Sequence, residues 1–250
     1  MIRPVKTYDE CRTFATSFQG DPSFSAPMLS SEEQVQCNLV RPIGNPDRYC
    51  VFGVYCEETL TGLFAFLVIR DEQYAEMLVG LSREKAAYSE ALQYLEQHFP
   101  GYGVDFVFNP GNCLLREQLN TRKADFEPEQ QKMVLEAPAP DMDTTGIVPL
   151  SDQYAEQYCP IHNKDMYWTG EKVMQAQDRF HTFLAIRDGR AVGYIDVTCT
   201  FKENEPFDLL VLEGYRRMGY GRKLLAKALE ANAPNAMSVL VDADNVPAIR

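Results

Sequence analysis

The chain has 250 residues, of which 45% are hydrophobic and 24% are charged, the balance of an ordinary soluble protein. Its length favours two compact domains over one, and each would be long enough to bury a core. The net charge of −12 argues against a nucleic-acid-binding protein, which needs a basic surface, and suits either a cationic partner or solubility alone.

The cysteines, the histidines and the apolar runs indicate no metal site and no membrane segment. The seven cysteines include no C-x-x-C pair and the three histidines are scattered, so zinc-ligand spacing is absent and buried, reduced thiols are expected. Residues 1–6 lack the apolar core of a signal peptide, and no apolar run is long enough to span a bilayer. We therefore expect a cytoplasmic protein without a metal, a membrane partner or a nucleic-acid partner.

The first half of the chain alternates helical and strand-like patterns. Ser82 is expected to cap a strong helix that buries Ala87, Ala91 and Leu92. The expected elements are helices 8–18 and 31–39, strands 50–55, 63–69 and 74–80, helix 82–99, strand 104–108, helix 113–121 and strand 131–135.

Residues 137–145 are rich in proline, acidic and small residues, without periodicity, and this composition predicts an exposed linker. The second half then repeats the order of the first. Its expected elements are strand 146–150, helices from Ser151 and over 171–178, strands 181–186, 190–200 and 207–212, helix 221–232, strand 237–241 and a helix that begins near Val246.

The repeated order of elements predicts two domains of one architecture, residues 1–136 and 146–250. We expect a mixed α/β fold of the α+β type, in which each domain has a mostly antiparallel central sheet flanked by helices.

The turn before helix 221–232 carries the most informative motif, Arg216-Arg217-Met218-Gly219-Tyr220-Gly221-Arg222. Its two glycines lack a Cβ, which permits a tight turn and lets the backbone approach a ligand closely. The free N–H groups at the start of the helix, together with the arginines, suit a pyrophosphate. The motif is neither a dinucleotide fingerprint nor a Walker A loop. The alternative interpretation is that the arginines are only solvated charges at the start of a helix.

The pattern Arg-x-x-Gly-x-Gly after a strand resembles the acetyl-CoA-binding signature of the GCN5-related N-acetyltransferase (GNAT) family, over residues 208–225. Residues 239–248 are similar to the family's next strand and its Asn-x-x-Ala helix start. The resemblance covers about residues 146–250 and implies a tandem protein. The first domain has Leu81-Ser82-Arg83-Glu84 and no glycine pair at the equivalent turn, so we expect a degenerate copy that does not bind coenzyme A.

The resemblance also implies which residues bind acetyl-CoA. In the family, the pantetheine arm pairs like an extra strand with the end of the fourth strand, which splays from the next, and the asparagine often bonds the arm. The implied residues are Leu210, Val211, Leu212, Arg216, Arg217, Met218, Gly219, Tyr220, Gly221, Arg222 and Asn245.

The family pattern continues beyond the Asn-x-x-Ala helix with two strands and a tyrosine that commonly protonates the coenzyme A thiolate, whereas this sequence ends at Arg250. We expect that the second domain is truncated relative to the natural protein, or that the first domain or another subunit covers the edge of the buried strand 237–241. The general acid stays unassigned, with Tyr215 and Tyr220 as alternatives.

Asp208 is the candidate general base, because a carboxylate beside apolar strand residues can take a proton from an ammonium group, directly or through water. The alternative is a solvent-exposed residue at the start of a strand. Tyr194 and Asp196 are secondary candidates for the acceptor pocket, and Tyr167 with Trp168 would wall it or simply pack.

The sequence thus predicts an acetyl-CoA-dependent N-acetyltransferase that moves an acetyl group by direct attack of a primary amine of a small molecule or peptide. The alternative is a non-catalytic coenzyme-A-binding or interaction protein that keeps the fold. A monomer and a homo-oligomer are both compatible with the sequence.

Overall fold

The structure is a computed structural model that describes residues 1–24, 29, 31–135, 142–164 and 168–249. The chain divides into two compact units, Met1–Glu127 and Pro128–Arg250. Within the described residues, no helix combines the length and the apolarity needed to cross a bilayer.

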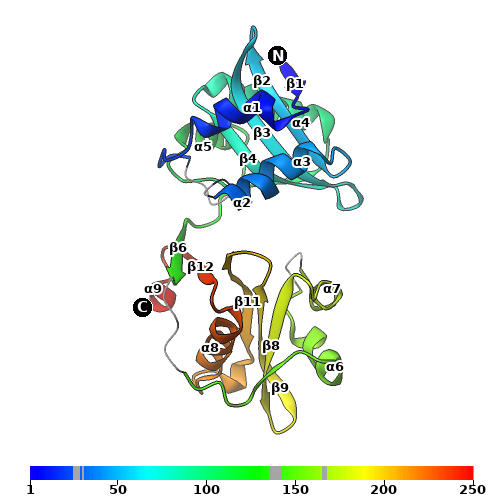
Figure 1. Cartoon of the computed structure of the whole chain (residues 1–250), viewed down its shortest axis with the longest axis vertical. Helices are drawn as coiled ribbons and strands as arrows, with labels where there is room; N and C mark the ends of the chain where they lie inside the picture. Colours follow the sequence, from blue (N-terminus) through cyan, green and yellow to red (C-terminus); the bar gives the residue numbers. More distant parts are fainter. Residues whose placement is uncertain (25–28, 30, 136–141, 165–167, 250) are drawn as a thin grey trace. The chain divides into compact units, whose positions relative to one another are not determined.

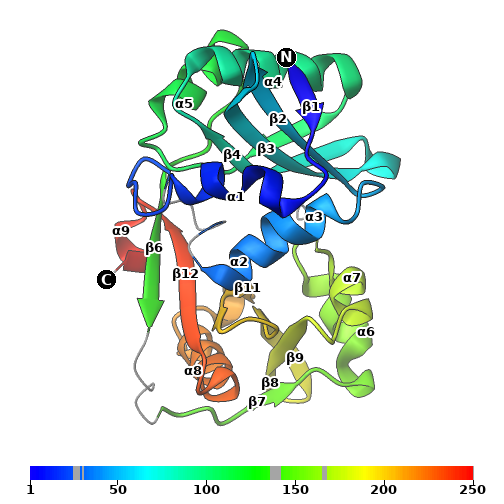
Figure 2. The same ribbon diagram turned by 45° about the horizontal axis from the view of Figure 1, so that its top comes forward.

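The first unit is a five-stranded sheet with helices on both faces (Figures 1 and 2). The strand order is β1–β2–β3–β4–β5, and only β4 and β5 run parallel. The helices α4 and α5 pack on one face, and α1 with the segment α2–α3 packs on the other. The elements are β1 (Ile2–Pro4), α1 (Tyr8–Thr16), α2 (Glu32–Val35), a π turn (Gln36–Val40), α3 (Arg41–Ile43), β2 (Tyr49–Cys56), β3 (Thr59–Ile69), a 3-10 turn (Arg70–Glu72), β4 (Tyr74–Ser82), α4 (Lys85–His98), β5 (Gly103–Phe106) and α5 (Cys113–Thr121).

The second unit holds a four-stranded antiparallel sheet, β11–β9–β8–β7, and a three-stranded sheet, β10–β12–β6. In the four-stranded sheet, α8 packs on one face and α6 with α7 on the other (Figure 1). The elements are β6 (Gln130–Leu135), β7 (Ile147–Pro149), α6 (Asp152–Ile161), α7 (Gly170–Gln175), β8 (Phe180–Arg187), β9 (Arg190–Thr198), β10 (Glu203–Asn204), β11 (Pro206–Val211), a 3-10 turn (Glu213–Tyr215), α8 (Tyr220–Asn232), β12 (Ala236–Asp242) and α9 (Val246–Ile249).

The division between the units lies nine residues before the predicted boundary after residue 136, because β6 belongs to the second unit. This strand was predicted to close the first domain, but it pairs antiparallel with β12 from Met237 to Asp242, which is all of β12 except its first residue. Of the predicted linker 137–145, residues 137–141 lie outside the described residues.

The strand β12 was predicted to be fully buried, and the structure corrects this. Only Met237 and Ser238 are buried, and Leu240 is 45% exposed. Its two edges are covered by β10, over two residues, and by β6. The second half of β12 is paired on one edge only, by β6, because β10 reaches only Ala236 and Met237.

Two smaller expectations were also wrong. Of the seven cysteines only Cys11 is buried, and Cys56 and Cys113 are exposed. Ser82 is not the N-cap of α4, because the helix begins three residues later; its Oγ instead accepts the N–H of Glu84 and donates to the carbonyl of Thr61.

The β6–β12 ladder predicts a contrast between two proline substitutions. Ala243 N donates to Glu129 O at 2.8 Å, so alternation along the antiparallel ladder makes Met133–Val239 a hydrogen-bonded pair and Val134–Ser238 a non-bonded one. We expect Met133→Pro to lower the free energy of unfolding of the second unit by about 1–3 kcal/mol, because a ladder bond is lost.

Val134→Pro is the matched control, since the N–H of Val134 points away from β12 and proline is tolerated there on an edge strand. Urea unfolding followed by Trp168 fluorescence reports on the second unit, because Trp168 is the chain's single tryptophan. Equal losses in the two variants would contradict the pairing.

Candidate active site

The strand β11 leaves one of its two edges without a partner strand. Its neighbour β10 pairs in parallel with β12 only over Glu203–Ala236 and Asn204–Met237. From Pro206 onward, β11 pairs with β9 and, among the described residues, with no other strand. The segment that forms β10 and β11 therefore starts beside β12, and β11 then diverges from β12 toward the carboxyl ends of both strands, as the family resemblance implied.

Backbone alternation decides which residues of β11 face this open edge. Leu212 N donates to Val192 O at 2.9 Å, so Leu212 and Leu210 direct their backbone groups to β9. The backbone groups of Leu209 and Val211 consequently point the other way. Of the three strand residues implied by the family resemblance, only Val211 has this orientation, and Leu209 joins it.

The carbonyl of Val211 already has a partner from the glycine turn. The Arg216 side chain donates from Nε to Val211 O at 3.0 Å. Arg216 is exposed, and this bond ties the first residue of the motif to the open edge of β11. A basic group is thereby held where β11 ends.

The glycine turn has the backbone of an anion-binding concavity. Gly219 has a φ of 87° and Arg217 a φ of 60°, both in the left-handed region. Gly219 is the N-cap of α8, and no side chain caps the helix. The first N–H groups of α8, at Tyr220, Gly221 and Arg222, therefore have no intrahelical acceptor.

Neither the backbone conformation at position 221 nor the packing around it requires a glycine. Its φ is not positive, and an added Cβ would meet only Leu209 Cδ2 and Val211 Cγ2, each at 3.9 Å, which is ordinary contact. A helix would prefer alanine here. The missing Cβ leaves the surface between β11 and the start of α8 open to a ligand.

The remaining residues of the motif surround this helix start with positive and apolar groups. Arg217, Met218 and Arg222 are exposed, and Met218 is 55% exposed. Tyr220 packs against the α8 side of the sheet. Asn245 lies on an exposed turn just after β12, with its N–H bonded to Asp242 O.

Asp208 lies on β11, two residues before Leu210, and is aimed by a β-bulge. Pro206 pairs with Val197 and Asp208 with Asp196, so Phe207 is an extra residue and the strand side chains switch face there. The Asp208 side chain is only 13% exposed, and its Oδ2 accepts the Tyr194 hydroxyl at 2.5 Å. Asp208 is thus a half-buried, hydrogen-bonded carboxylate rather than a solvated residue at the start of a strand.

Beneath Asp208 lies a buried polar cluster centred on Asp196, which is fully buried. Asp196 accepts hydrogen bonds from the Tyr158 hydroxyl at 2.8 Å and from Thr182 Oγ1 at 2.6 Å, and it lies 2.9 Å from His162 Nε2. The helix α6 contains Pro160 near its end and stops at Ile161, so the chain turns and brings His162 under the sheet.

The pKa values of this cluster reflect burial and its two carboxylates. Burial would lower the pKa of His162, but the hydrogen bonds to Asp196 and to the carbonyl of Asn163, with the charges of Asp196 and Asp208, raise it overall. Burial and the neighbouring Asp196 raise the pKa of Tyr158, and burial and the bond to Asp208 raise that of Tyr194. Both tyrosines are therefore hydrogen-bond donors at neutral pH.

Sequence reasoning named Asp208, Tyr194 and Asp196 but missed His162, Tyr158 and Thr182. Tyr194 and Asp196 lie in the buried cluster rather than on the wall of an acceptor pocket. Trp168 packs against Phe180, and Tyr167 lies outside the described residues. The described residues contain no group of three or more His, Cys, Asp or Glu side chains arranged to hold a metal ion.

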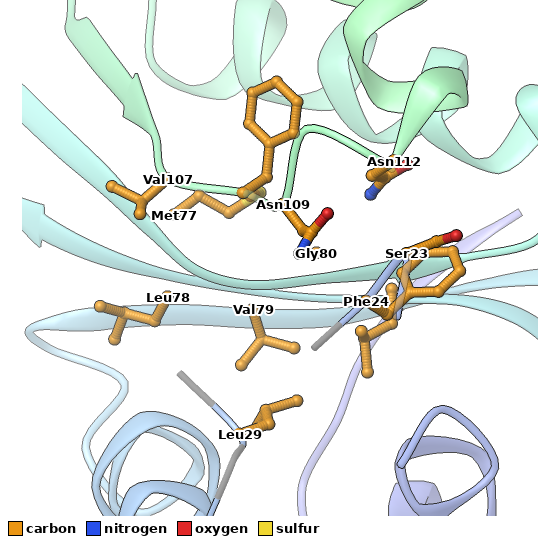
Figure 3. Close-up of a pocket in the computed structure, with 12 residues that line it drawn as sticks. Ser23, Phe24, Leu29, Met77, Leu78, Val79, Gly80, Val107, Asn109 and Asn112 are labelled. Carbon is orange, nitrogen blue, oxygen red and sulfur yellow. The ribbon is translucent and has the colours of Figure 1, made fainter. Parts of the chain in front are cut away.

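The equivalent place in the first unit is filled by the chain itself. There β4 pairs with β5 only up to Met77–Phe106, and the space beyond is lined by β4, by residues after β5 and by Ser23, Phe24 and Leu29 (Figure 3). The remaining cavity has a volume of about 20 Å³, room for a water molecule.

At the equivalent turn of the first unit, the basic side chain serves internal contacts. Arg83 donates to the carbonyl of Ser17 at 3.0 Å and lies 4.0 Å from the ring centre of Phe18. It also forms an ion pair with Asp21. No glycine stands at this helix start and Arg83 is bound within the unit, whereas Arg217 and Arg222 at the turn of the second unit are exposed.

Comparisons with known proteins agree with this geometry. The model of the acetyltransferase (GNAT) family matches residues 147–250. A GCN5-related N-acetyltransferase from Sphaerobacter thermophilus is similar in structure, with a TM-score of 0.65 and 14% identity over 98% of this chain and 88% of that chain. A tandem GNAT protein from the clavulanic acid biosynthesis pathway has a TM-score of 0.57 and 14% identity over 100% of this chain and 92% of that chain.

The remaining comparisons cover less of the chain or give no match. The chain spans 55% of the length of a GNAT-family acetyltransferase from Novosphingobium aromaticivorans, with 19% identity, 48% of this chain covered and a TM-score of 0.41. No curated protein matches the chain. At these identities the solved structures show the fold, and the family itself rests on the match to the second unit. Residues 147–250 therefore form a domain of the GNAT acetyltransferase family, and the whole chain has the fold of a tandem GNAT protein whose first copy is degenerate.

Proposed function

We propose that the second unit is an acetyl-CoA-dependent N-acetyltransferase that acts on a primary amine of a small molecule or peptide. The observation that carries the proposal is the open edge of β11 that leads directly into the uncapped glycine turn. An extended arm needs backbone partners, and a pyrophosphate needs free N–H groups next to positive charge. Both requirements are met within residues 209–222.

The residues fit the coenzyme. Leu209 and Val211 would pair with the pantetheine arm, and the N–H groups of Tyr220, Gly221 and Arg222 would bind the pyrophosphate, with Arg217 and Arg222 adding charge. Asn245, beyond β12, would reach the arm from the other strand. Bound acetyl-CoA supplies an acetyl thioester as the group to be transferred.

Asp208 would serve as the base. A primary amine has a pKa near 10 and is an ammonium ion at neutral pH, so it must lose a proton before it can attack a carbonyl. Asp208 Oδ2 is held by Tyr194, and among the described residues no hydrogen bond reaches its Oδ1. Oδ1 would take the proton, and the backbone N–H of Val211 would stabilise negative charge on the carbonyl oxygen. The net charge of −12 favours a cationic acceptor.

We further propose that only the second unit binds coenzyme A. In the first unit, Ser23, Phe24 and Leu29 lie beside β4, and Arg83 is bonded internally. Titration calorimetry should therefore give about one coenzyme A site per chain.

Gly221→Ala tests the coenzyme site without disturbing the fold. We expect the dissociation constant of coenzyme A to rise at least about tenfold, because the new Cβ stands where the ligand must approach the backbone. The free energy of unfolding should stay the same or rise by up to about 1 kcal/mol, since alanine favours a helix over glycine.

Gly214→Ala is the matched control, because an added Cβ at Gly214 meets no atom within 4 Å and the residue precedes the turn. It should leave both the affinity and the stability unchanged. Wild-type affinity in Gly221→Ala would show that no ligand approaches this helix start.

Asp208→Asn tests the reaction itself. Against a panel of primary amines we expect kcat to fall by about 10²- to 10⁴-fold, the usual contribution of a general base, with coenzyme A affinity unchanged. Asp152→Asn, at an exposed residue in the first turn of α6, is the control for loss of a carboxylate.

The same assay separates the proposal from its rival. Coenzyme A binding without turnover of any amine would favour a non-catalytic binding protein that keeps the fold. Turnover that survives in Asp208→Asn would keep the transferase and remove Asp208 as its base.

A further inference from the structure

His162 has two hydrogen-bond partners that are both acceptors. Its Nδ1 lies 2.8 Å from the carbonyl oxygen of Asn163, and its Nε2 lies 2.9 Å from Asp196 Oδ2. A neutral imidazole has one N–H and one lone pair, so it cannot donate to both. The geometry thus requires either an imidazolium or a proton on Asp196.

The surroundings of Asp196 favour the charged pair. The carboxylate accepts from the hydroxyl groups of Tyr158 and Thr182 in addition to His162. Several donors aimed at one carboxylate stabilise its ionised form. His162 and Asp196 are 1% and 0% exposed, so this is a buried ion pair whose partners are all satisfied by hydrogen bonds.

His162 and the residue after it also hold Tyr194. The two rings are stacked, with centres 4.8 Å apart and planes inclined by 16°. The N–H of Asn163 donates to the Tyr194 hydroxyl at 2.9 Å, and this hydroxyl donates to Asp208 Oδ2 at 2.5 Å. His162 Nε2 itself lies 4.0 Å from the same oxygen of Asp208.

We propose that His162 is a positioning residue for the base: held as an imidazolium by Asp196, it fixes Tyr194, and Tyr194 fixes Asp208 with one carboxylate oxygen bonded and the other free. The proposal rests on the function proposed above. The ordering of Asp208 matters because a base must reach the proton it removes within hydrogen-bond distance.

Other charged and titratable groups face His162 from the elements that pack around it. Those that act on its charge or lie against its ring are Tyr158 from α6, Glu171 from α7, Tyr194 and Asp196 from β9, and Asp208 from β11.

Nuclear magnetic resonance tests the charge state without any turnover. The chain has three histidines, so ¹⁵N-labelled imidazole signals can be assigned with His162→Gln. We expect both ring nitrogens of His162 to carry protons at pH 7.5, above the ordinary histidine pKa of about 6.5. An unprotonated nitrogen at that pH would overturn the proposal.

The same spectra test the positioning. The short bond from Tyr194 to Asp208 should give a downfield hydroxyl proton signal in the wild-type chain, absent from Tyr194→Phe. In His162→Gln this signal should be lost while backbone amide shifts far from the cluster stay in place. A retained signal in His162→Gln would show that His162 does not hold the pair.

Steady-state kinetics provide the last test of the positioning role. In His162→Gln we expect kcat to fall about 10- to 100-fold with coenzyme A affinity within about twofold of wild type. Adding His162→Gln to Asp208→Asn should cost nothing further, since His162 acts through Asp208. The exposed His181→Gln is the matched control and should leave kcat unchanged.

These experiments distinguish a failure of the positioning role from a failure of the proposed function. Additive losses in the double variant, or wild-type kcat in His162→Gln, would overturn the positioning role while the transferase stands. If no amine is acetylated by the wild-type chain, the proposed function fails, and the hydroxyl signal still decides whether His162 holds Tyr194 on Asp208.

Discussion

The divergence of β11 from β12 is the constraint on which the rest of the second unit depends. The parallel contact to β12 comes from β10, over Glu203–Ala236 and Asn204–Met237, and β11, which follows β10, pairs among the described residues with β9 alone. Backbone N–H and C=O groups need partners, so the outward groups of Leu209 and the N–H of Val211 are left for water or for a ligand, while the carbonyl of Val211 accepts from Arg216. The glycine turn begins where this edge ends, and it adds free N–H groups in line with the strand.

The same divergence is present in the first unit with the opposite outcome. There β4 extends beyond its pairing with β5 after Met77, but Ser23, Phe24 and Leu29 lie alongside it, and Arg83 is bonded to Ser17 and Asp21. Exposed strand edges are commonly covered by other parts of the chain. The edge is covered in this way in the first unit, whereas in the second unit the edge of β11 stays open.

Structural features that depend on neighbouring residues could be predicted from the sequence. Features that depend on contacts between residues far apart along the chain could not. Helix 113–121 was predicted with the bounds that the structure has, because its apolar spacing and its preceding Asn112 are local signals. The glycine turn was found because its two glycines and its arginines stand close together in the sequence, although of the two glycines only Gly219 takes a left-handed φ. The pairing of β6 with β12 was missed, since its partners lie more than 100 residues apart along the chain. His162 was missed because a lone histidine after a proline gains meaning only from Asp196, 34 residues later.

The central claim is that the open edge of β11 takes the coenzyme arm. The most direct measurement is residue-resolved amide hydrogen exchange of β11 with and without coenzyme A. The amides of Leu210 and Leu212 should exchange slowly in both states, because both bond to β9. Those of Leu209 and Val211 should exchange fast in the free chain and slow by at least about tenfold at saturating coenzyme A. Protection of Leu209 and Val211 in the free chain, or no change on saturation, would contradict the account.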